Sequence, residues 1–447
     1  MMPSKGKKHC CLTLPSDVLS NLPENVIDII LMCLPFKDAV RTSILSNIWR
    51  YKWCRLPELT LDETVWTTKN NEMFCPRKIS IIIYHILMLH VGPITKFILY
   101  ITSSSRYLEI DDLIYFLFRN GIQHFVLGLP FSGNPYKLPV SFFKCLQLTH
   151  LTLQNCSILP PSNFKGFDRL IRLELRDVTI SSKFLGSLIS NCLLLEQLVL
   201  RISEHLNIIE IKAPKLKSFD FTGSIRFLTL KDVPLLAKLS LADTRDDEKE
   251  GICDIAKFFE SFSALEHLHL GNGSIELFAG IGGALSKRFP FVLNCVKRLY
   301  LSDRYRGELE VISFAVCLIR SFPCLQYLEI EVLYLHGDGT SALESLKVEH
   351  FSDVTFNHLK EVNLKYIKGS KRLLQLMKLL LAKSPVLVRM LIESYQDEES
   401  ATVKIFATEL SKCQRASPTT EVVFIKQNYL AKLISTYLAK IRSYSQV

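Results

Sequence analysis

The feature that most constrains the fold is a short apolar motif that recurs along the chain. Apolar residues occupy its first, fourth and sixth positions, and it first occurs as ITKFIL at residues 94–99. Successive copies begin 20 to 34 residues apart. The twelve copies begin at Ile94, Ile122, Leu148, Leu170, Leu195, Leu216, Leu236, Leu265, Val296, Leu325, Leu359 and Leu387. An ordered series of this length indicates a repeat architecture.

The spacing of the copies predicts which architecture this is. Repeats of about 20–29 residues with this apolar core are typical of leucine-rich repeats, each of which supplies one strand plus a helix or turn. The second and third apolar residues lie two positions apart, so both point into the core. Stacking buries a continuous core, and we expect an irregular α/β solenoid with parallel strands on its concave side. Helices are expected between strands at 182–192, 252–261 and 310–321.

The strand positions that point away from the core form a second pattern. They mix polar, aromatic and charged side chains of both signs, as partner-binding surfaces tend to do. Solenoids generally bind partners on the concave surface, so we expect these positions to contact a target protein. The expected target-binding residues are His150, Arg172, Gln197, Lys238, His267, His269, Arg298, Tyr300 and Tyr327. The alternative interpretation is that they form the solvated face of a sheet.

The stretch from Leu19 to Trp53 has a different, helical pattern. It predicts one helix from Pro23 to Leu34, a second from Asp38 to Leu45, and a third capped by Ser46 that carries Trp49 and Trp53 on one face. Domains below about 40 residues rarely bury enough apolar surface to be stable alone. Much of this apolar surface must therefore meet either the rest of the chain or a partner.

This stretch resembles a plant F-box. The resemblance is carried in order by Leu22-Pro23, the Leu34-Pro35 break, residues 39–43 (AVRTS), Leu45-Ser46 and the two tryptophans. Ile48 departs from the pattern, since a basic residue is usual there. The resemblance implies docking onto a Skp-type adaptor and, through it, onto the cullin of a RING-type ubiquitin ligase. The positions carried over as adaptor-facing or core residues are Leu22, Pro23, Ile27, Ile30, Leu31, Leu34, Pro35, Val40, Leu45, Trp49 and Trp53.

The C-terminal hundred residues continue with strands expected at 359–364, 387–392 and 421–425, and with helices at 371–383 and 402–410. The order of the strand at 359, the helix and the strand at 387 resembles the FBD region of plant F-box/leucine-rich-repeat proteins. An apolar stripe at 430–441 predicts a helix that caps the array. A helix for a membrane surface or a partner is the alternative.

These patterns divide the chain into four expected parts. They are a flexible N-terminus at 1–15, an F-box at 16–62, a repeat solenoid at 63–350, and an FBD region with a capping helix at 351–447. Between the F-box and the repeats, Leu59 and Leu61 start a candidate strand, and 79–91 predicts a buried helix.

Composition excludes several classes of protein. Apolar residues make up 48% of the 447 residues and charged residues 22%, which is typical of a folded domain. The net charge of +10 is spread along the chain apart from Lys5, Lys7 and Lys8, so we do not expect nucleic-acid binding. The longest near-apolar run, 79–91, is shorter than the roughly 18 residues that a membrane span requires. Thirteen cysteines without a C-x-x-C pair, and no expected secretory leader, favour reduced thiols in the nucleus or cytoplasm.

No catalytic motif accompanies these patterns. The sequence has no phosphate-binding loop, H-E-x-x-H motif, nucleophile elbow or paired-cysteine zinc motif. The glycine-rich residues 280–283 are expected to form a turn, and 243–250 a solvated loop. His267 and His269 share a face, but a closed metal site needs further ligands, so neither a metal nor a cofactor is expected.

We therefore expect a non-enzymatic substrate receptor, whose N-terminal helices dock on the adaptor and whose solenoid holds a target protein. Two alternatives remain open at this stage. One is a small-molecule receptor in which Arg172, Lys238, His267 and Arg298 bind an anionic ligand in the repeat concavity. The other is a scaffold that binds the adaptor and never delivers a substrate.

Overall fold

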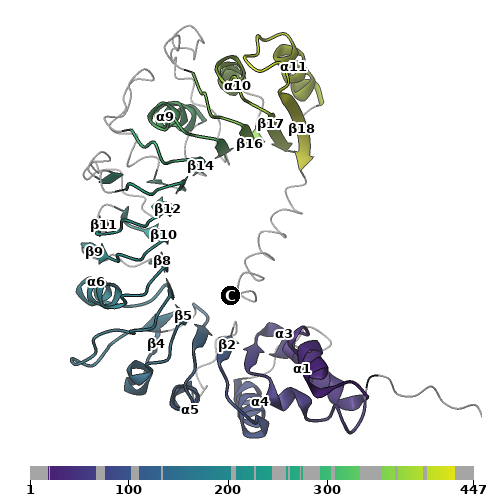
Figure 1. The fold of residues 1–447 in the computed structure, drawn as a ribbon, viewed down its shortest axis with the longest axis vertical. Coiled ribbons are helices and arrows are strands. Elements are labelled where there is room, and N and C mark those ends of the chain that lie inside the picture. Colours follow the sequence, from purple (N-terminus) through teal and green to yellow (C-terminus); the bar gives the residue numbers. More distant parts are fainter. Residues whose placement is uncertain are drawn as a thin grey trace, which may run out of the picture. The chain divides into compact units, whose positions relative to one another are not determined.

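The computed structural model describes the chain in two compact units, residues 1–133 and 134–447. The residues described are 19, 21–66, 76–101, 110–131, 134–202, 208–225, 228–243, 258–259, 262–271, 273–274, 292–303, 308–332, 355–367, 371–395 and 400–427. The turn predicted at 280–283 and the helix predicted at 430–441 lie outside them, as does almost all of the loop predicted at 243–250. Figure 1 shows the order of the elements.

Unit 1 begins with short helices and continues into the first strands of the repeat array. Its elements are α1 (Glu24–Met32), α2 (Phe36–Arg41), η1 (Thr42–Ile44), η2 (Lys52–Arg55), β1 (Glu58–Leu61), α3 (Glu63–Trp66), α4 (Pro76–Leu89), β2 (Lys96–Tyr100), α5 (Ile110–Arg119) and β3 (His124–Gly128). The strands pair in parallel in the order β1-β2-β3. The candidate strand at Leu59 and Leu61 is thereby confirmed.

The first predicted helix is confirmed, and the other two need correction. Pro23 is the N-cap of α1. The second helix begins at Phe36, because Pro35 takes the cap position; Asp38 lies in its first turn and pairs with Arg41 at 2.9 Å. After Ser46 the chain forms turns and the 3₁₀ helix η2 instead of an α-helix. The aromatic and β-branched residues that crowd positions 48–53 have low helix propensity.

The helix predicted at 79–91 exists as α4, but only one side of it is buried. Ile79, Ile83 and Ile86 recur at helical spacing and are buried. Ile81 and Met88 are exposed, which corrects the expectation of a fully buried helix.

Unit 2 contains a long parallel sheet, in the order β5-β7-β8-β10-β12-β13-β14-β15-β16-β17-β18. The strands are β5 (His150–Gln154), β7 (Arg172–Arg176), β8 (Gln197–Arg201), β10 (Ser218–Gly223), β12 (Lys238–Asp243), β13 (His267–Leu270), β14 (Arg298–Asp303), β15 (Tyr327–Val332), β16 (Glu361–Ile367), β17 (Arg389–Tyr395) and β18 (Glu421–Gln427). Its helices are η3 (Val140–Lys144), α6 (Ser182–Asn191), α9 (Glu308–Ser321), α10 (Lys371–Lys383) and α11 (Ser400–Ser411).

Every copy of the motif forms a strand, which confirms the predicted leucine-rich-repeat fold. Each strand from β2 to β17 that corresponds to a copy begins two residues after the copy's first apolar residue. In β7, for example, Leu173 and Leu175 are fully buried together with the preceding Leu170. The helices α6, α9 and α10 lie where they are predicted; of the helix at 252–261 only residues 258–259 are described, and they are helical.

Two short strand pairs are absent from the sequence prediction, which expects helices or turns there. They are β4 (Tyr136–Lys137) with β6 (Cys156–Ser157), and β9 (Ile209–Lys212) with β11 (Leu228–Lys231). Each pair forms between two successive repeats, so its partners are far apart in the sequence.

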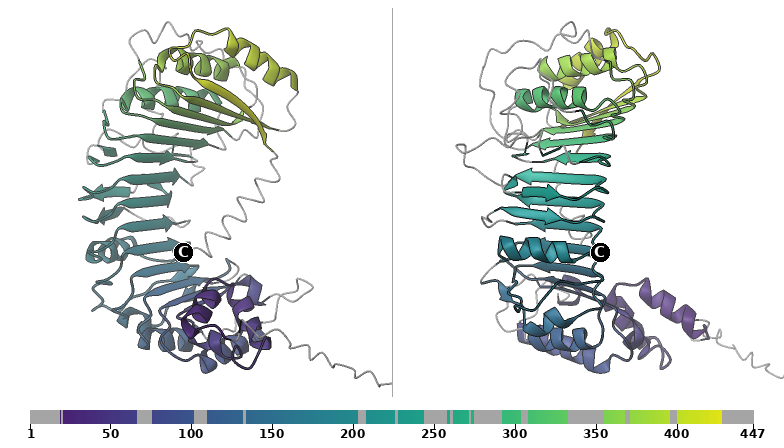
Figure 2. Two further views of the ribbon diagram at one scale, coloured as in Figure 1. Left: turned by 45° about the vertical axis from the view of Figure 1, so that its right-hand side comes forward. Right: turned by 60° about the vertical axis from the view of Figure 1, so that its left-hand side comes forward.

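The sheet of unit 2 has one covered and one uncovered face. Helices α6, α9 and α10 lie on the same side of the strands (Figures 1 and 2). Apolar side chains at alternate strand positions point toward these helices and make the core. We call the opposite side the open face; it carries the first, third and fifth residues of each strand, beginning with His150 in β5 and Arg172 in β7.

Candidate adaptor-docking and target-binding surfaces

The N-terminal helices have a small core of their own. Ile27 and Leu31 lie one turn apart on α1 and are buried, as are Trp49 and Trp53. The ring of Phe36 meets the Trp53 indole edge to face, with 5.9 Å between the centroids. The side of α1 that carries Ile27 and Leu31 is therefore the inner side.

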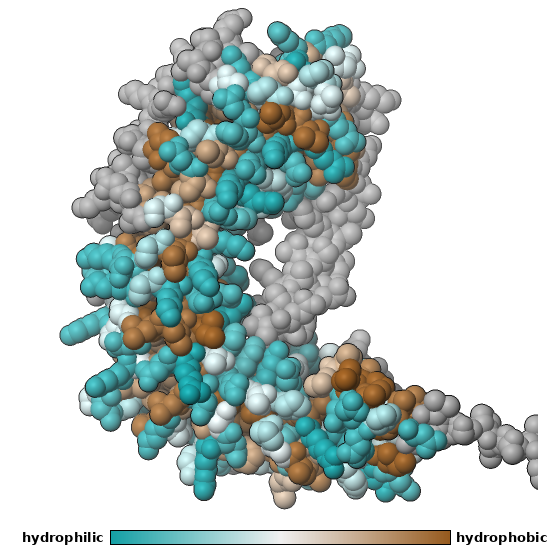
Figure 3. Space-filling view, in the orientation of Figure 1, coloured by the Kyte–Doolittle hydropathy of each residue, from teal (hydrophilic) through white to brown (hydrophobic). Residues whose placement is uncertain are grey.

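Other apolar side chains of these helices are exposed to solvent. On α1, Ile29 and Met32 lie on the outer side, and after α2 the side chain of Ile44 is 87% exposed. We call this set the N-terminal apolar surface: Leu19, Ile29, Met32, Ile44, Leu45, Ile48 and Tyr51. Brown areas over the N-terminal helices in Figure 3 show apolar residues at the surface. Several exposed apolar residues within so short a segment indicate a binding surface.

An ion-pair cluster joins the two ends of this segment. The carboxylate of Glu24, at the start of α1, lies 2.5 Å from Lys52 Nζ and 3.3 Å from Arg55 Nη1, both in η2. The hydrogen bond from Lys52, together with the two positive charges, lowers the pKa of Glu24 below its ordinary value. The cluster holds α1 against η2 and so orients the N-terminal apolar surface.

Within unit 1 the helices are attached to the first strands by hydrogen bonds. The Val91 amide donates to the Cys54 carbonyl at 2.7 Å, and the Thr95 amide donates to the Pro57 carbonyl at 2.9 Å. The indole N–H of Trp66 donates to the Tyr100 carbonyl at 3.0 Å. These bonds fix the helices to β1 and β2. The N-terminal apolar surface is therefore attached to the first repeats by hydrogen bonds as well as by the chain itself.

In unit 2 the parallel register aligns the side chains of the open face into rows. The first row, from β5 to β16, is His150, Arg172, Gln197, Ser218, Lys238, His267, Arg298, Tyr327 and Glu361. The second row is Thr152, Glu174, Val199, Asp220, Ser240, His269, Tyr300, Glu329 and Asn363. All nine residues expected to bind a target lie in these two rows.

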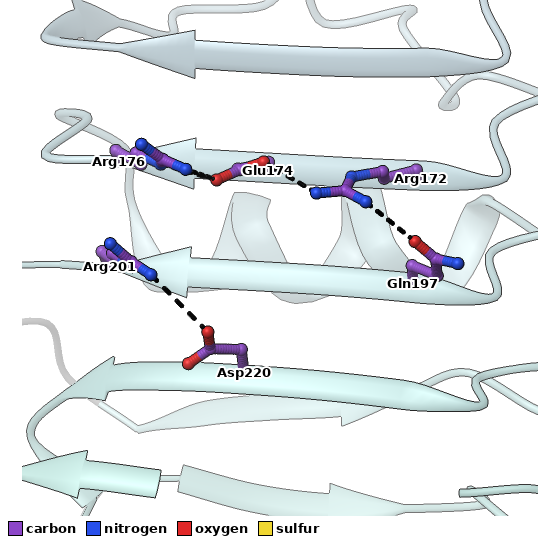
Figure 4. A network of polar contacts seen from close by, with 6 residues as sticks. All are labelled: Arg172, Glu174, Arg176, Gln197, Arg201 and Asp220. Carbon is purple, nitrogen blue, oxygen red and sulfur yellow. Dashed lines mark hydrogen bonds and ion pairs between the residues drawn. The ribbon is translucent and has the colours of Figure 1, made fainter. Parts of the chain in front are cut away.

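At one part of the open face a buried carboxylate lies between two arginines, and a third arginine nearby pairs with Asp220 (Figure 4). Glu174 is only 2% exposed and accepts a hydrogen bond from Arg176 Nε at 2.5 Å. Arg172 lies 3.3 Å from the other carboxylate oxygen and donates to Gln197 Oε1 at 3.1 Å. Arg201 lies 3.7 Å from Asp220. The arginine charges here are largely neutralised by Glu174 and Asp220.

A second network surrounds Glu329 on β15. One carboxylate oxygen accepts hydrogen bonds from the Tyr327 hydroxyl at 2.6 Å and from Asn363 Nδ2 at 3.2 Å, and the other pairs with Lys365. Burial and the Glu329 charge raise the pKa of Tyr327 well above its ordinary value, so the phenol stays protonated. The guanidinium of Arg298 lies over the Tyr327 ring, 5.3 Å from its centroid.

The two histidines of β13 lie in different surroundings. The imidazole of His269 lies between the hydroxyls of Ser240 and Ser302, at 3.2 and 3.1 Å. Burial lowers the pKa of His269, and burial together with the charges of Lys238 and Arg298 lowers that of His267, so both rings favour the neutral form. Among the described residues, no three His, Cys, Asp or Glu side chains are grouped so as to hold a metal ion.

Comparison with known proteins identifies the family. The F-box domain model matches residues 19–60, and the model described as "FBD-associated F-box protein At5g56370, LRR repeats" matches residues 110–330. The F-box/FBD/LRR-repeat protein At1g13570 of Arabidopsis thaliana is 30% identical over 420 residues, which cover 92% of this chain and 99% of that protein. This chain belongs to the F-box/FBD/LRR-repeat family.

Other Arabidopsis thaliana proteins match this F-box/FBD/LRR-repeat protein at lower identity. The putative F-box/FBD/LRR-repeat protein At5g44950 is 26% identical over 423 residues, covering 92% of this chain and 86% of that protein. The F-box/LRR-repeat protein At4g14103 is 27% identical over 332 residues, covering 70% and 84%. The two resemblances noted in the sequence, to the F-box and to the FBD region, are confirmed at the level of the family.

The eleven F-box positions expected to be adaptor-facing or core residues differ in their exposure to solvent. Ile27, Leu31, Trp49 and Trp53 are buried; Leu22, Ile30, Leu34 and Val40 are partly exposed; Pro23, Pro35 and Leu45 are exposed. The four buried residues hold the F-box together, and the other seven are accessible to a partner. Which of them contact an adaptor stays a prediction.

The adaptor-facing residues predicted from the sequence of this F-box/FBD/LRR-repeat protein include little of the N-terminal apolar surface. Leu45 belongs to both sets, whereas Ile29, Met32 and Ile44 are exposed and lie outside the prediction. A usable signal was present in α1, where apolar residues occur on all sides of the helix. A helix that is apolar all round must be covered on more than one side, and a partner protein can cover one of them.

No described helix of the F-box/FBD/LRR-repeat protein combines the length and the apolar composition that crossing a bilayer requires.

Proposed function

We propose that this F-box/FBD/LRR-repeat protein is the substrate-recognition subunit of an SCF-type ubiquitin ligase. The observation that carries the proposal is the N-terminal apolar surface, on a segment that matches the F-box domain model. Its partner would be a Skp-type adaptor, and through it a cullin. The open face of unit 2 would bind the target protein.

The proposed mechanism is positional and involves no reaction at this protein. A target held in the same assembly as the charged conjugating enzyme is exposed to a high effective concentration of ubiquitin thioester. Transfer to a target lysine then becomes nearly intramolecular, which removes much of the entropic cost of the encounter. The residues described here orient two partners, and the chemistry belongs to the rest of the ligase.

We propose a place in the nucleus or cytoplasm, supported by the cysteines that the structure describes, which are free thiols. Burial raises the pKa of the Cys156 thiol to about 12 and that of the Cys192 thiol to about 11. Such thiols are unreactive at neutral pH and behave as small core residues. They suit a reducing compartment.

Co-purification tests the proposal. The full chain carrying Leu22→Ala and Pro23→Ala is expected to lose a Skp-type adaptor that the wild type retains through size-exclusion chromatography. A chain with Leu159→Ala, an exposed apolar residue of unit 2, is the matched control and should keep the adaptor. Adaptor retention by the double variant at the wild-type level would contradict docking through this segment.

A second experiment separates substrate delivery from scaffolding. Proteins that are captured by the full chain with the proteasome inhibited are identified, and their turnover is followed with the wild type and with a chain lacking residues 1–60. Delivery predicts that at least one captured protein is stabilised by the deletion. Unchanged turnover of every captured protein would favour the scaffold.

The small-molecule alternative receives partial support from the register. Lys238, His267 and Arg298 lie side by side on β12, β13 and β14. Arg172 lies apart from them, with β8 and β10 between, and it is engaged with Glu174 and Gln197. Three of the four residues therefore lie together, but Arg172 does not, so the four do not form one anion site.

A further inference from the structure

The first row of the open face is free of carboxylates over much of its length. From His150 on β5 to Tyr327 on β15, the described strands place no aspartate or glutamate in this row. The second row holds three acidic residues, which are Glu174, Asp220 and Glu329. Each of these has a basic partner within the sheet.

Two cations of the first row have no such partner. Lys238 and Arg298 are both exposed, and neither has a carboxylate of a described residue within ion-pair distance. Arg298 hydrogen-bonds to Tyr300, and Glu361 acts on it only through its charge. They flank His267, because β13 pairs with β12 on one side and with β14 on the other. Neighbouring strands are about 4.8 Å apart, so the two cations start from backbones about 10 Å apart.

Aromatic rings hold one end of this group in place. Tyr327 lies beneath the Arg298 guanidinium, and its ring centroid is 5.3 Å from that of Tyr300. The Tyr327 hydroxyl is anchored to Glu329, so the ring is not free to turn away. We call Lys238, His267, Arg298, Tyr300 and Tyr327 the basic strip.

The effect of the two cations is visible at the residue between them. Burial is the largest cause of the lowered pKa of His267, and the charges of Lys238 and Arg298 lower it further against the opposing charge of Glu266, since a third positive charge between the two cations is disfavoured. The same arrangement favours a negative charge placed over His267. A partner that brings carboxylates to this point gains attraction to both cations and meets no like charge in the row until Glu361.

We propose that the basic strip binds an acidic, extended segment of the target protein. This inference rests on the proposed role as a substrate receptor. In an extended peptide, side chains two residues apart lie about 7 Å apart on one side, so two carboxylates with one residue between them can reach Lys238 and Arg298. An aromatic residue beside them would lie against Tyr300 and Tyr327.

Several features favour a peptide over a nucleic acid. Binding to a nucleic-acid backbone usually draws on many phosphate contacts, and this strip offers two cations that form no ion pair with a described residue. The row is then interrupted by Glu361, and the arginines around Glu174 are already paired. A short segment with two or three negative charges matches the strip in length and charge.

Binding of synthetic peptides to the full chain in complex with a Skp-type adaptor tests the inference. The probe is a fluorescein-labelled decapeptide that contains Glu-Ser-Glu-Ser-Phe in a Gly-Ser background, so that both glutamates and the phenylalanine lie on one side of the extended chain. Matched probes replace both glutamates with glutamine or with phosphoserine, and a ten-nucleotide oligothymidine is the nucleic-acid probe. The readout is fluorescence anisotropy at low and at physiological salt.

The glutamate and phosphoserine peptides are expected to bind, and the glutamine peptide roughly tenfold more weakly. Lys238→Gln combined with Arg298→Gln should cost the glutamate peptide a similar factor. Lys144→Gln combined with Lys165→Gln, two exposed lysines in the connections on either side of β5, is the charge-matched control and should change nothing. As a second readout, the acidic peptide should raise the pKa of His267, followed by NMR.

Several outcomes would overturn the inference. They are equal affinity for the glutamate and glutamine peptides, no binding up to about 1 mM, unchanged affinity in a folded Lys238/Arg298 variant, or tighter binding of the oligonucleotide than of any peptide. The two proposals can fail separately. An adaptor that co-purifies with a chain indifferent to acidic peptides refutes only the strip, while charge-dependent peptide binding without adaptor binding refutes only the ligase role.

Discussion

Replacing Glu174 with glutamine is predicted to destabilise the repeats around β7 and β8. The side chain is 2% exposed and accepts charge-assisted hydrogen bonds from Arg176 and Arg172, whose side chains are 11% and 27% exposed. Glutamine keeps one acceptor oxygen but removes the negative charge between two guanidinium groups. Removing one member of a buried ion pair costs about 3–5 kcal/mol. Because Arg172 can regain water, we expect the low end, about 3 kcal/mol.

Two measurements test the predicted loss of stability. Urea titration monitored by circular dichroism gives the loss of stability, and hydrogen exchange shows where it occurs, since repeat proteins open locally as well as globally. Amides of β7 and β8 should exchange faster, while those of β16 and β17 should change little. Glu361→Gln, at an exposed position of β16, is the matched control and should stay within about 0.5 kcal/mol.

A smaller loss of stability for Glu174→Gln than for the control, or faster exchange spread evenly over the sheet, would refute the role given to Glu174. A further variant checks the cause. Replacing Glu174 and Arg176 together by methionine should cost less than Glu174→Gln alone, since removing a buried pair leaves no uncompensated charge between them.

Three further predictions concern the core, the histidines and the F-box. Leu241→Ala, at a fully buried position of β12, should cost about 3 kcal/mol by urea titration, whereas Leu193→Ala at an exposed position should cost less than about 0.5 kcal/mol. His269 has a lowered pKa in the folded state, so the unfolded chain takes up the proton first; its contribution is present above about pH 6.5 and lost as pH falls through the lowered value. Melting temperatures at pH 7.5 and 5.0 should therefore differ less in His269→Gln than in the wild type. Glu24→Gln should leave the overall fold intact but increase hydrogen exchange in α1 and η2, and unchanged exchange there would contradict the anchoring role of the Lys52 and Arg55 pairs.

The repeats could be predicted from the sequence because each one carries its own signal. A strand such as β12 needs Leu239 and Leu241 buried whatever its neighbours are. The spacing of the apolar residues is therefore sufficient to predict the strand. The β9–β11 and β4–β6 pairs carry no such signal. They form between the connections of successive repeats, and their partners are set by stacking and not by local pattern.

The candidate sites were predicted less completely, for two physical reasons. On α1 the apolar residues occur all round the helix, and only packing decides that Ile27 faces inward and Ile29 outward. On the open face the sequence shows that Arg172, Glu174 and Arg176 alternate along one strand. It does not show that Glu174 is buried between them, or that Lys238 and Arg298 form no ion pair with a described residue, because both depend on the register of neighbouring strands.

The most direct test of the central claim is the dissociation constant between the full chain and a Skp-type adaptor, measured by biolayer interferometry. Ile44→Asp combined with Leu45→Asp changes two exposed residues of the N-terminal apolar surface, and Leu159→Asp is the exposed control in unit 2. Burying two such side chains contributes about 1.5–3 kcal/mol each. We expect the double variant to bind roughly a hundredfold more weakly or worse, and the control to bind like the wild type. Wild-type affinity in a folded double variant would contradict docking through this surface.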